Sequence, residues 1–562
     1  MSRSPEHQFE SNVQQSVEYQ SDWRKNNTRM YEFYDGVQWS NEDLLVLQDR
    51  GQHPTVINLC RAQVDMIAAI QIESEADMVL VGRESGDEER AGDFTALLRQ
   101  VEDHSRYRFQ RNNAFLDGLK GGVGWLHTGV KDNQIWVRRR PWHEIYWDPY
   151  AVDPCMVDAR FIARQYWMDR DQAKKQWPKM AEEIEVLDSE KYGPQQDDFD
   201  SQEKDVQATL SNKPLITVGP NGRRIRITDH WYRDEKDEIH RVQYAGPIFL
   251  EGSEDGKNPS PFNDKDVYPF IPFCAFRDRH GNPMGIIAFI SSLQELLNKV
   301  NSKYLHTLSS YTALLEQGAI EDIDELRQQL ARPDSAIIVA DGALSSKRVE
   351  ITKQASELVH LRDMVQLYIG MIQRVTGVND ALLGFGGTNA RSAMQESSRN
   401  AQGTAMQTSI MDSFAATNQR IAEVMVKLIG QFYDDKTQVR ILGTNTGTAE
   451  FRNFNVPQPT AVVDTETGDV LGFGEPKKTS IKDILRYDVI FKRVTPFTSI
   501  REHQLTMIVE VIKAGVLPPQ VAAPLVIQNL DLPGKEEILQ ELQAAMQPQE
   551  PMGQPPQMAA GY

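Results

Sequence analysis

The stretch Ser356–Asp435 reads as two helices joined by a glycine-rich loop, whose centre is Thr376-Gly-Val-Asn-Asp-Ala-Leu-Leu-Gly-Phe-Gly-Gly-Thr-Asn-Ala-Arg391. Apolar residues at three- and four-residue steps predict the first helix, up to about Val375. Gly377 is placed to end it, as glycine commonly does after a helix. The second helix is predicted from about Met394 to Tyr433. As a straight rod it would be about 60 Å long, far longer than an ordinary globular helix.

The two halves of this second helix differ in character. The C-terminal half carries a core stripe at helical spacing, formed by Phe414, Ile421, Met425, Leu428 and Phe432. The N-terminal half has almost no apolar face, because it is rich in Gln, Ser, Asn and Thr. A helix that is polar all round needs neighbours to hold it. Further copies of the chain, packed through Ala401, Gly403 and Ala405, would supply those neighbours.

Composition narrows the class of protein. The chain has 562 residues, 40% of them hydrophobic and 25% charged, which is ordinary for a folded protein with several core-bearing regions. No apolar run approaches a membrane span, and the N-terminus lacks the apolar core of a signal peptide. The three cysteines are far apart in sequence and predict neither a zinc site nor a disulfide framework. We therefore expect an intracellular place of synthesis.

The formal net charge of −19 argues against a protein that binds DNA tightly and without sequence preference. Tight binding to phosphates usually requires a basic surface. An acidic surface is still compatible with DNA that slides past it. The chain also carries no Walker A sequence, no HExxH and no recognisable Ser-His-Asp arrangement. The sequence therefore predicts neither catalysis nor a cofactor.

Two local patterns invite a chemical interpretation that the sequence does not favour. The glycines of Gly118–Gly129 have neither P-loop nor GxGxxG spacing, so we predict a tight helix-to-strand turn there. Asp148, Asp153 and Asp158 recur every five residues, and a metal cluster could be proposed for their carboxylates. Two of the three precede proline, and Asp-Pro pairs usually begin turns. Turn formation is the favoured interpretation.

A small unit is inserted before the central stretch. The helical period from Met284 to Ser310 stops, and residues 311–350 contain an acidic helix around Glu321–Arg327 and an expected strand, Ala336–Ala340. Alternating strands are predicted before this region, within Leu215–Phe249, and after it, with a hairpin from Val463 to Val470. Residues 185–212 are acidic and polar, which predicts a loop.

The order of these parts resembles that of portal proteins from short-tailed bacteriophages, over roughly residues 20–530. The motifs that carry the resemblance are Tyr34-Asp-Gly-Val-Gln-Trp39, Arg50–Asn58, Gly121-Gly-Val-Gly124, Trp147-Asp-Pro149 with Asp158-Ala-Arg160, and Thr376–Gly384 before a long helix. Paired helices around an inserted α/β unit add to it. The resemblance implies an α+β portal fold: a mixed α/β wing, two stem helices, a small clip, a long helix behind a tunnel loop, and a helical crown.

The resemblance also implies boundaries. We expect the wing at 1–284 and 437–497, the stem helices at 285–310 and 356–377, the clip at 311–355, the tunnel loop at 378–393, the long helix at 394–436, the crown at 498–546, and a disordered tail at 547–562. Some relatives continue into a long C-terminal helical barrel, which we expect to be absent or disordered in this chain.

Portal proteins form a ring, typically of twelve subunits, at one capsid vertex. By resemblance, the expected partners are copies of the chain, double-stranded DNA in the channel, the terminase large subunit, capsid and scaffolding proteins, and then tail or head-completion proteins. The expected location is the virion, after synthesis in the cytoplasm of a bacterial host.

The residues offered for these roles fall into two groups. The DNA channel is expected to involve Lys299, Lys303, Arg374, Gly384, Gly386, Gly387, Asn389, Arg391 and Arg399. Docking of terminase or tail proteins is expected to involve Glu316, Glu321, Asp322, Asp324 and Glu325. The alternatives without a DNA or docking role are ion pairs with acidic neighbours in adjacent subunits for the cations, and a solvated helix face for the acids. For the whole chain the alternatives are a head–tail adaptor or another virion ring component, and a metal-dependent nuclease that uses the three aspartates.

Overall fold

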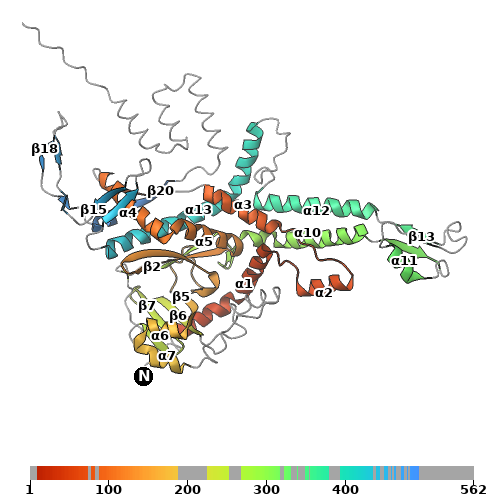
Figure 1. Ribbon diagram of the computed structural model, residues 1–562, viewed down its shortest axis with the longest axis horizontal. Helices are drawn as coiled ribbons and strands as arrows, with labels where there is room; N and C mark the ends of the chain where they lie inside the picture. Colours follow the sequence, from red (N-terminus) through yellow and green to blue (C-terminus); the bar gives the residue numbers. More distant parts are fainter. Residues whose placement is uncertain are drawn as a thin grey trace, which may run out of the picture.

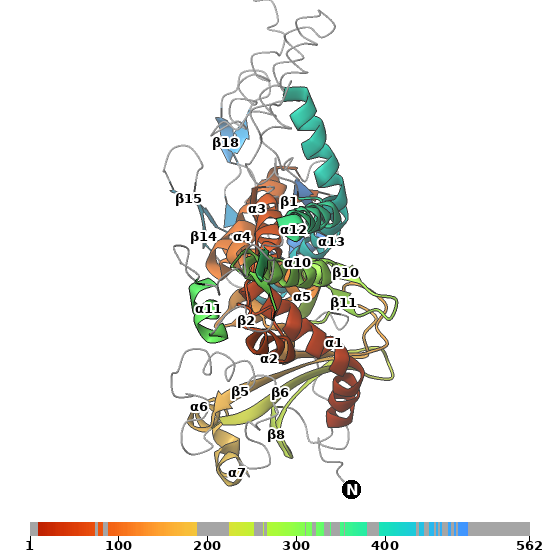
Figure 2. The same cartoon turned by 90° about the vertical axis from the view of Figure 1, so that its right-hand side faces the viewer.

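The computed structural model of the chain describes residues 9–73, 77–82, 88–187, 224–251, 262, 267–309, 311–316, 322–330, 338, 349–352, 355–378, 393–433, 438–442, 449–453, 457–458, 461–463, 470–473, 477–478 and 481–492. Figures 1 and 2 show a mixed body of helices and strands from which two long helices extend side by side to a small tip. The predicted α+β class is confirmed. Among the described helices, none has the length and apolar character needed to cross a bilayer.

The N-terminal helices fix the body to the base of the long helices. They are α1 (Ser11–Asp35), α2 (Asn41–Asp49) and α3 (Leu59–Glu73). Helix α1 ends at Gly36, whose φ of 92° is left-handed backbone that glycine adopts without strain. Trp23 of α1 is buried, donates from Nε1 to the carbonyl of Pro283 at 2.6 Å, and lies edge-on to Trp147.

The charged stretch from Glu88 to about Gly118 predicts a single helix from its sequence, but the structure has two helices there. Helix α4 (Glu88–Ser105) and α5 (Tyr107–Gly121) are separated by Arg106, which adopts a left-handed φ of 52°. Without a glycine or proline at the break, the sequence carries no ordinary stop signal. Tyr107, the first residue of α5, is fully buried, which fixes the new helix direction.

The helix-to-strand turn predicted in Gly118–Gly129 is confirmed. Gly122 follows α5 with φ of 93°, and strand β2 begins at Val123. A Cβ on Gly124 would lie 1.8 Å from the carbonyl oxygen of Ala114, so the strand approaches the helix too closely for any side chain. The glycines therefore serve close packing.

Two antiparallel sheets form the body. The three-stranded sheet has the order β3-β2-β9, and the five-stranded sheet runs β4-β5-β6-β7-β8. Their strands are β2 (Val123–Lys131), β3 (Gln134–Arg140), β4 (Ile145–Trp147), β5 (Phe161–Asp169), β6 (Arg224–Arg233), β7 (Ile239–Ala245), β8 (Ile248–Glu251) and β9 (Phe270–Cys274). The short helices α6 (Arg170–Gln176) and α7 (Ala181–Val186) cover one end of the larger sheet. Strand β9 is buried and lies at a sheet edge.

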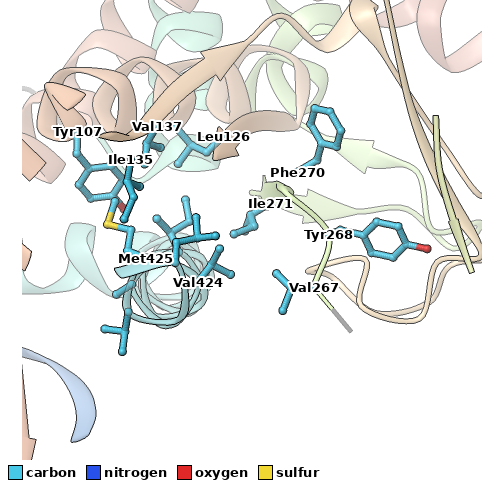
Figure 3. Packing of buried hydrophobic residues seen from close by; sticks show 14 of the residues in the cluster. Tyr107, Leu126, Ile135, Val137, Val267, Tyr268, Phe270, Ile271, Val424 and Met425 are labelled. Atoms are coloured by element: carbon cyan, nitrogen blue, oxygen red, sulfur yellow. The ribbon is translucent and has the colours of Figure 1, made fainter. Parts of the chain in front are cut away.

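Helix α13 (Ala393–Phe432) runs through the largest core. Figure 3 shows Val424 and Met425 on this helix facing apolar side chains of β3, β9 and the start of α5. All five residues of the predicted stripe lie in or against the core, and burial extends beyond one face, to Ala422, Val424 and Val426. The C-terminal half of α13 is thus surrounded by the body.

Helix α13 is not straight. Figures 1 and 2 show it bent, with its N-terminal turns rising away from the body. The side chains of residues 393–406 lie outside the described residues, so the polar character of this half stays a sequence observation.

Segments far apart in sequence complete the body. Strand β1 (Asp77–Gly82) pairs antiparallel with β20 (Tyr487–Lys492), and the 3-10 helix Ile481–Arg486 packs on α13. The predicted hairpin is present, since Val463 pairs with Val470 between β17 (Ala461–Val463) and β18 (Val470–Phe473). The other described pairs are β10 (Phe276–Arg277) with β11 (Pro283–Met284), β14 (Gln438–Leu442) with β15 (Ala449–Asn453), and β16 (Pro457–Gln458) with β19 (Lys477–Lys478).

Several predictions fall outside the described residues. They are most of the acidic loop at 185–212, the strand at 336–340 apart from Ile338, the crown at 498–546 and the tail at 547–562.

Candidate DNA channel and docking tip

The candidate site is built on two antiparallel helices, α10 (Ile286–Ser309) and α12 (Ala355–Thr376). They lie where the sequence predicted helices at 285–310 and 356–377, and they pack along each other as they leave the body (Figure 1). At about 1.5 Å per residue, α10 extends roughly 36 Å. Such a pair can carry the residues at its far end well away from the core.

A strip of buried polar residues holds the helix pair to the N-terminal region. Gln294, Asn298 and Ser302 recur every four residues along α10 and are almost fully buried. Their side chains donate to the carbonyl of Ile57, the side-chain oxygen of Gln38 and the carbonyl of His53, each at 2.6 Å. Buried polar side chains whose hydrogen bonds are satisfied favour a single packing arrangement, here that of α10 against the N-terminal region. Sequence reasoning missed this strip, although its four-residue spacing was visible.

Both lysines predicted for the channel have carboxylate partners within the same chain. Lys299 Nζ lies 3.2 Å from Asp43 Oδ2 on α2, and Lys303 Nζ lies 2.7 Å from Glu357 Oε1 on α12. All four side chains are between 36% and 55% exposed, so each pair contributes at most about 1 kcal/mol to stability. The pairs nevertheless cancel the charge that would attract phosphate.

Arg374 differs from the two lysines. It is exposed near the end of α12 and has no ion-pair partner among the residues that the structure describes. Arg399 lies in the N-terminal turns of α13, but its side chain is not described. The predicted loop residues Gly384, Gly386, Gly387, Asn389 and Arg391 fall outside the described residues.

The far end of the helix pair carries a small α/β unit. Strand β12 (Thr312–Leu315) pairs antiparallel with β13 (Val349–Thr352), and helix α11 (Ile323–Leu330) lies between them in sequence. This pairing closes the insertion at its base, so the chain leaves α10 and enters α12 at one place. The sequence predicted the helix but not these two strands.

The acids predicted for docking have different roles. Asp322 precedes α11, and its Oδ1 accepts from the backbone N–H of Glu325 at 3.1 Å, which is an N-cap. Glu316 and Glu325 are exposed at the tip. Glu321 and the side chain of Asp324 are outside the described residues. Asp322 thus has a structural function that the sequence alone did not assign.

Asp148, Asp153 and Asp158 stabilise turns through hydrogen bonds, which is the interpretation that the sequence favoured. Both carboxylate oxygens of Asp148 accept from the guanidinium of Arg160, and each also accepts a backbone N–H. Burial alone would raise the pKa of Asp148, but the hydrogen bonds from Arg160 and from the backbone lower it overall. Asp158 accepts from the N–H groups of Val152 and Asp153. The carboxylate oxygens of Asp148 and Asp158 therefore stabilise the loop through hydrogen bonds.

One other group could hold a metal by proximity among the described residues: Asp234, Glu238 and His240. Asp234 Oδ1 accepts from the N–H groups of Lys236 and Glu238, and Oδ2 lies 3.0 Å from His240 Nε2. This is the hydrogen-bonding pattern of the turn between β6 and β7. The cluster is explained by the turn.

Comparisons with known proteins identify the family of the chain. A family model described as phage P22-like portal protein matches residues 10–258 and 235–561. The portal protein of Helicobacter pylori bacteriophage KHP30 is 19% identical over 524 residues, which are 91% of this chain and 78% of that protein. Because the family model spans nearly the whole chain, the chain belongs to the phage P22-like portal protein family.

Proposed function

We propose that this chain assembles as a ring of twelve copies around a channel for double-stranded DNA. Membership of the portal family makes it a virion protein of the capsid's portal vertex, with a role in genome packaging and ejection. The observation that best supports the ring is the helix pair α10–α12, which projects from the body with a separate α/β unit at its tip (Figures 1 and 2). A single copy leaves much of this pair exposed.

The domain assignment follows from this proposal. Helices α10 and α12 would be the stem, the unit at 311–355 the clip, and the loop 378–393 the tunnel loop. The wing at 1–284 and 437–497 is supported by the pairing of β1 with β20, which joins its two segments. The crown at 498–546 is proposed from the resemblance alone.

The tip is proposed to dock the terminase large subunit during packaging, and tail or head-completion proteins afterwards. Its separation from the body would let partners exchange without disturbing the core. Exposed carboxylates at Glu316 and Glu325 would provide charge for basic partners. Capsid and scaffolding proteins would contact the wing.

DNA contact is proposed for Arg374 and for the loop 378–393. Sparse cations in a strongly acidic ring would give weak, salt-sensitive contacts, which suit a duplex in motion. The proposal includes no catalysis, so the energy for packaging would come from a separate ATPase. The nuclease alternative is disfavoured because the carboxylates of Asp148 and Asp158, its proposed metal ligands, accept backbone hydrogen bonds within the turn at residues 148–160. The family match disfavours a head–tail adaptor.

The proposal is tested with charge reversal at the tip. Glu325→Lys should leave rings and shells intact but prevent terminase docking, measured as packaged DNA per particle. Asp322 is unsuitable for this test because its loss would also destabilise α11. Glu182→Lys on α7 is the matched control, since it changes the same charge on the body. Normal packaging by Glu325→Lys would exclude this residue from the docking contact.

A further inference from the structure

The packing of the two sheets of the body brings arginine side chains together beside β3. Figures 1 and 2 show β2 next to the larger sheet, and the ring centroid of Trp125 on β2 lies 5.6 Å from that of Trp147 on β4. His127 is two residues further along β2 and therefore shares the face of Trp125. Arg140 and Arg138 are the register partners of Trp125 and His127 on β3. Their side chains are therefore on the face that meets the larger sheet.

Four arginines surround the imidazole of His127. Arg140 donates from Nε to Nδ1 of His127 at 3.2 Å, which requires an unprotonated Nδ1. Burial lowers the pKa of His127 well below its usual range, and the charges of Arg140, Arg164, Arg241 and Arg138 lower it further. Arg164 comes from β5 and Arg241 from β7, so both sheets contribute to the cluster. The imidazole is neutral at neutral pH, and the positive charge of the cluster comes from the arginines.

Carboxylates neutralise the two arginines of the larger sheet. Arg164 Nε lies 2.7 Å from Glu144 Oε2, and both side chains are less than one-fifth exposed. Arg241 Nε lies 2.9 Å from Asp229 Oδ1, and Arg241 Nη1 lies 3.6 Å from Glu251 Oε2. Asp229 and Glu251 belong to β6 and β8, and Glu144 directly precedes β4. The larger sheet therefore supplies the counter-ions for its own arginines.

The two arginines of β3 differ from those of the larger sheet. Arg138 and Arg140 have no carboxylate within ion-pair distance among the residues that the structure describes. Arg139 lies between them, faces the other side of the sheet and donates to Asp117 at 2.8 Å. The guanidinium carbons of Arg138 and Arg140 lie 5.2 and 5.7 Å from the centroid of the Trp136 ring. Contact with an aromatic ring orients a guanidinium but leaves its charge in place.

The charge on Arg140 is maintained in unfavourable surroundings. Burial, followed by the charge of Arg164, lowers the pKa of Arg140 to about 10, against an opposite effect of Glu144. The guanidinium therefore remains protonated at neutral pH. A partly buried cation without a counter-ion is destabilising until an anion reaches it. Ionisable groups that are perturbed by burial and by neighbouring charge are typical of functional sites.

We propose that Arg138 and Arg140 form a binding site for an acidic segment of a partner protein, whose carboxylates supply the missing counter-ions. The planar fork of a guanidinium matches a carboxylate. Strand β3 lies at the edge of its sheet and Arg138 is exposed, so a ligand can approach from solvent. The inference goes beyond the portal function and does not depend on ring assembly.

The acids of the same cluster favour a protein ligand over a nucleic acid. Glu144, Asp229 and Glu251 would repel the successive phosphates of a nucleic-acid backbone that ran across this surface. An acidic segment can place single carboxylates at Arg138 and Arg140 and avoid these three acids. Because the whole chain carries a net charge of −19, an acidic ligand has little general attraction to it. Binding of such a ligand would therefore report a specific site.

The test measures the binding of a synthetic peptide to the full-length chain by isothermal titration calorimetry. The probe is a peptide of alternating Glu and Gly with acetylated and amidated ends, and the same peptide with Gln in place of Glu is the control ligand. The Glu peptide should bind, and added NaCl should weaken the binding. Arg138→Gln should weaken it at least about tenfold, because charge-assisted hydrogen bonds are lost.

Two further variants separate the site from a general effect of charge. Arg279 is exposed and donates from Nε to His280 Nε2 at 3.0 Å, so Arg279→Gln removes the same charge outside the cluster and should leave the affinity unchanged. Arg140→Lys keeps the positive charge but loses the planar fork, and it should bind the Glu peptide more weakly than the unchanged chain does. Thermal unfolding of each variant verifies that it is folded.

Three results would overturn the inference. They are unchanged affinity in both Arg138→Gln and Arg140→Lys, equal binding of the Glu and Gln peptides, and failure of the Glu peptide to bind at low salt. Inorganic phosphate that binds as tightly as the Glu peptide and competes with it would indicate a site for small anions, and would overturn the assignment to a protein partner. Ring formation and DNA packaging are measured separately, so each of these results would leave the portal function standing.

Discussion

The ammonium group of Lys303 lies 2.7 Å from Glu357, and this contact joins the outward and returning helices of the stem near the tip. A cation that pairs within its own chain is a poor candidate for holding phosphate. The pairing therefore moves the expected DNA contacts away from Lys303 and, for the same reason, away from Lys299.

Arg374 is expected to influence DNA passage more than the two stem lysines. Arg374→Gln removes an exposed cation without a described partner, whereas Lys299→Gln with Lys303→Gln removes charges that are already neutralised. The expected result is less DNA per particle, or faster loss of packaged DNA at raised salt, for Arg374→Gln alone. Quantifying DNA in purified particles checks this. Equal effects of the two changes would contradict the assignment.

Loss of the cap at Asp322 should loosen α11 without affecting the stem. Asp322→Ala removes the acceptor for the N–H of Glu325 and is expected to cost about 1 kcal/mol in local stability. Asp322→Ser retains a capping oxygen and serves as the control. Hydrogen exchange of the α11 amides should be faster in Asp322→Ala than in Asp322→Ser. Identical protection in both would show that the cap is dispensable.

The ion pair between the buried carboxylate of Asp148 and the exposed guanidinium of Arg160 should make stability depend on acid pH. The pKa of Asp148 is lowered in the folded protein, so its contribution is present above the unfolded value of about 3.9 and is lost as pH falls through the folded pKa. Asp148→Asn should therefore be less stable than the unchanged chain at pH 7, by about 2 kcal/mol. The difference should shrink below about pH 4. A difference that is constant between pH 7 and pH 3 would rule out this charge effect.

The glycine-rich loop should be needed for handling DNA rather than for assembly. Deleting residues 384–389, or changing Arg391→Glu, is expected to leave rings and shell incorporation unchanged while packaging or DNA retention fails. The reasoning is that three glycines allow an excursion that a packed turn does not require. Particle counts and DNA content separate the two effects. Full, infectious particles from either variant would exclude the loop as a DNA contact.

Local signals in the sequence predicted much of the fold. The bounds of α12 and α13 differ from the prediction by only a residue or two, because Gly377 ends one helix and the core stripe of Phe414 to Phe432 marks the other. The break at Arg106 was not predictable in this way, since no residue type there signals a left-handed conformation. Burial of Tyr107 in the core decides it.

Contacts between distant residues were beyond the sequence. Lys299 meets Asp43 only because α2 folds back onto the stem, and Lys303 meets Glu357 only because β12 and β13 close the tip. The spacing of the apolar residues predicts the helix α12, but Met364 and Met371 are exposed whereas Leu361 and Ile372 are buried. Helical spacing shows that a face exists, but only packing shows which face the body covers.

The most direct test of the portal assignment is electron microscopy of the purified full-length chain, with mass measured on the same sample. We predict closed rings with a central channel and a mass near twelve times 63.9 kDa, and neighbouring ring sizes outside the shell are compatible with this prediction. A chain that stays a monomer or dimer at every concentration and salt condition would contradict it.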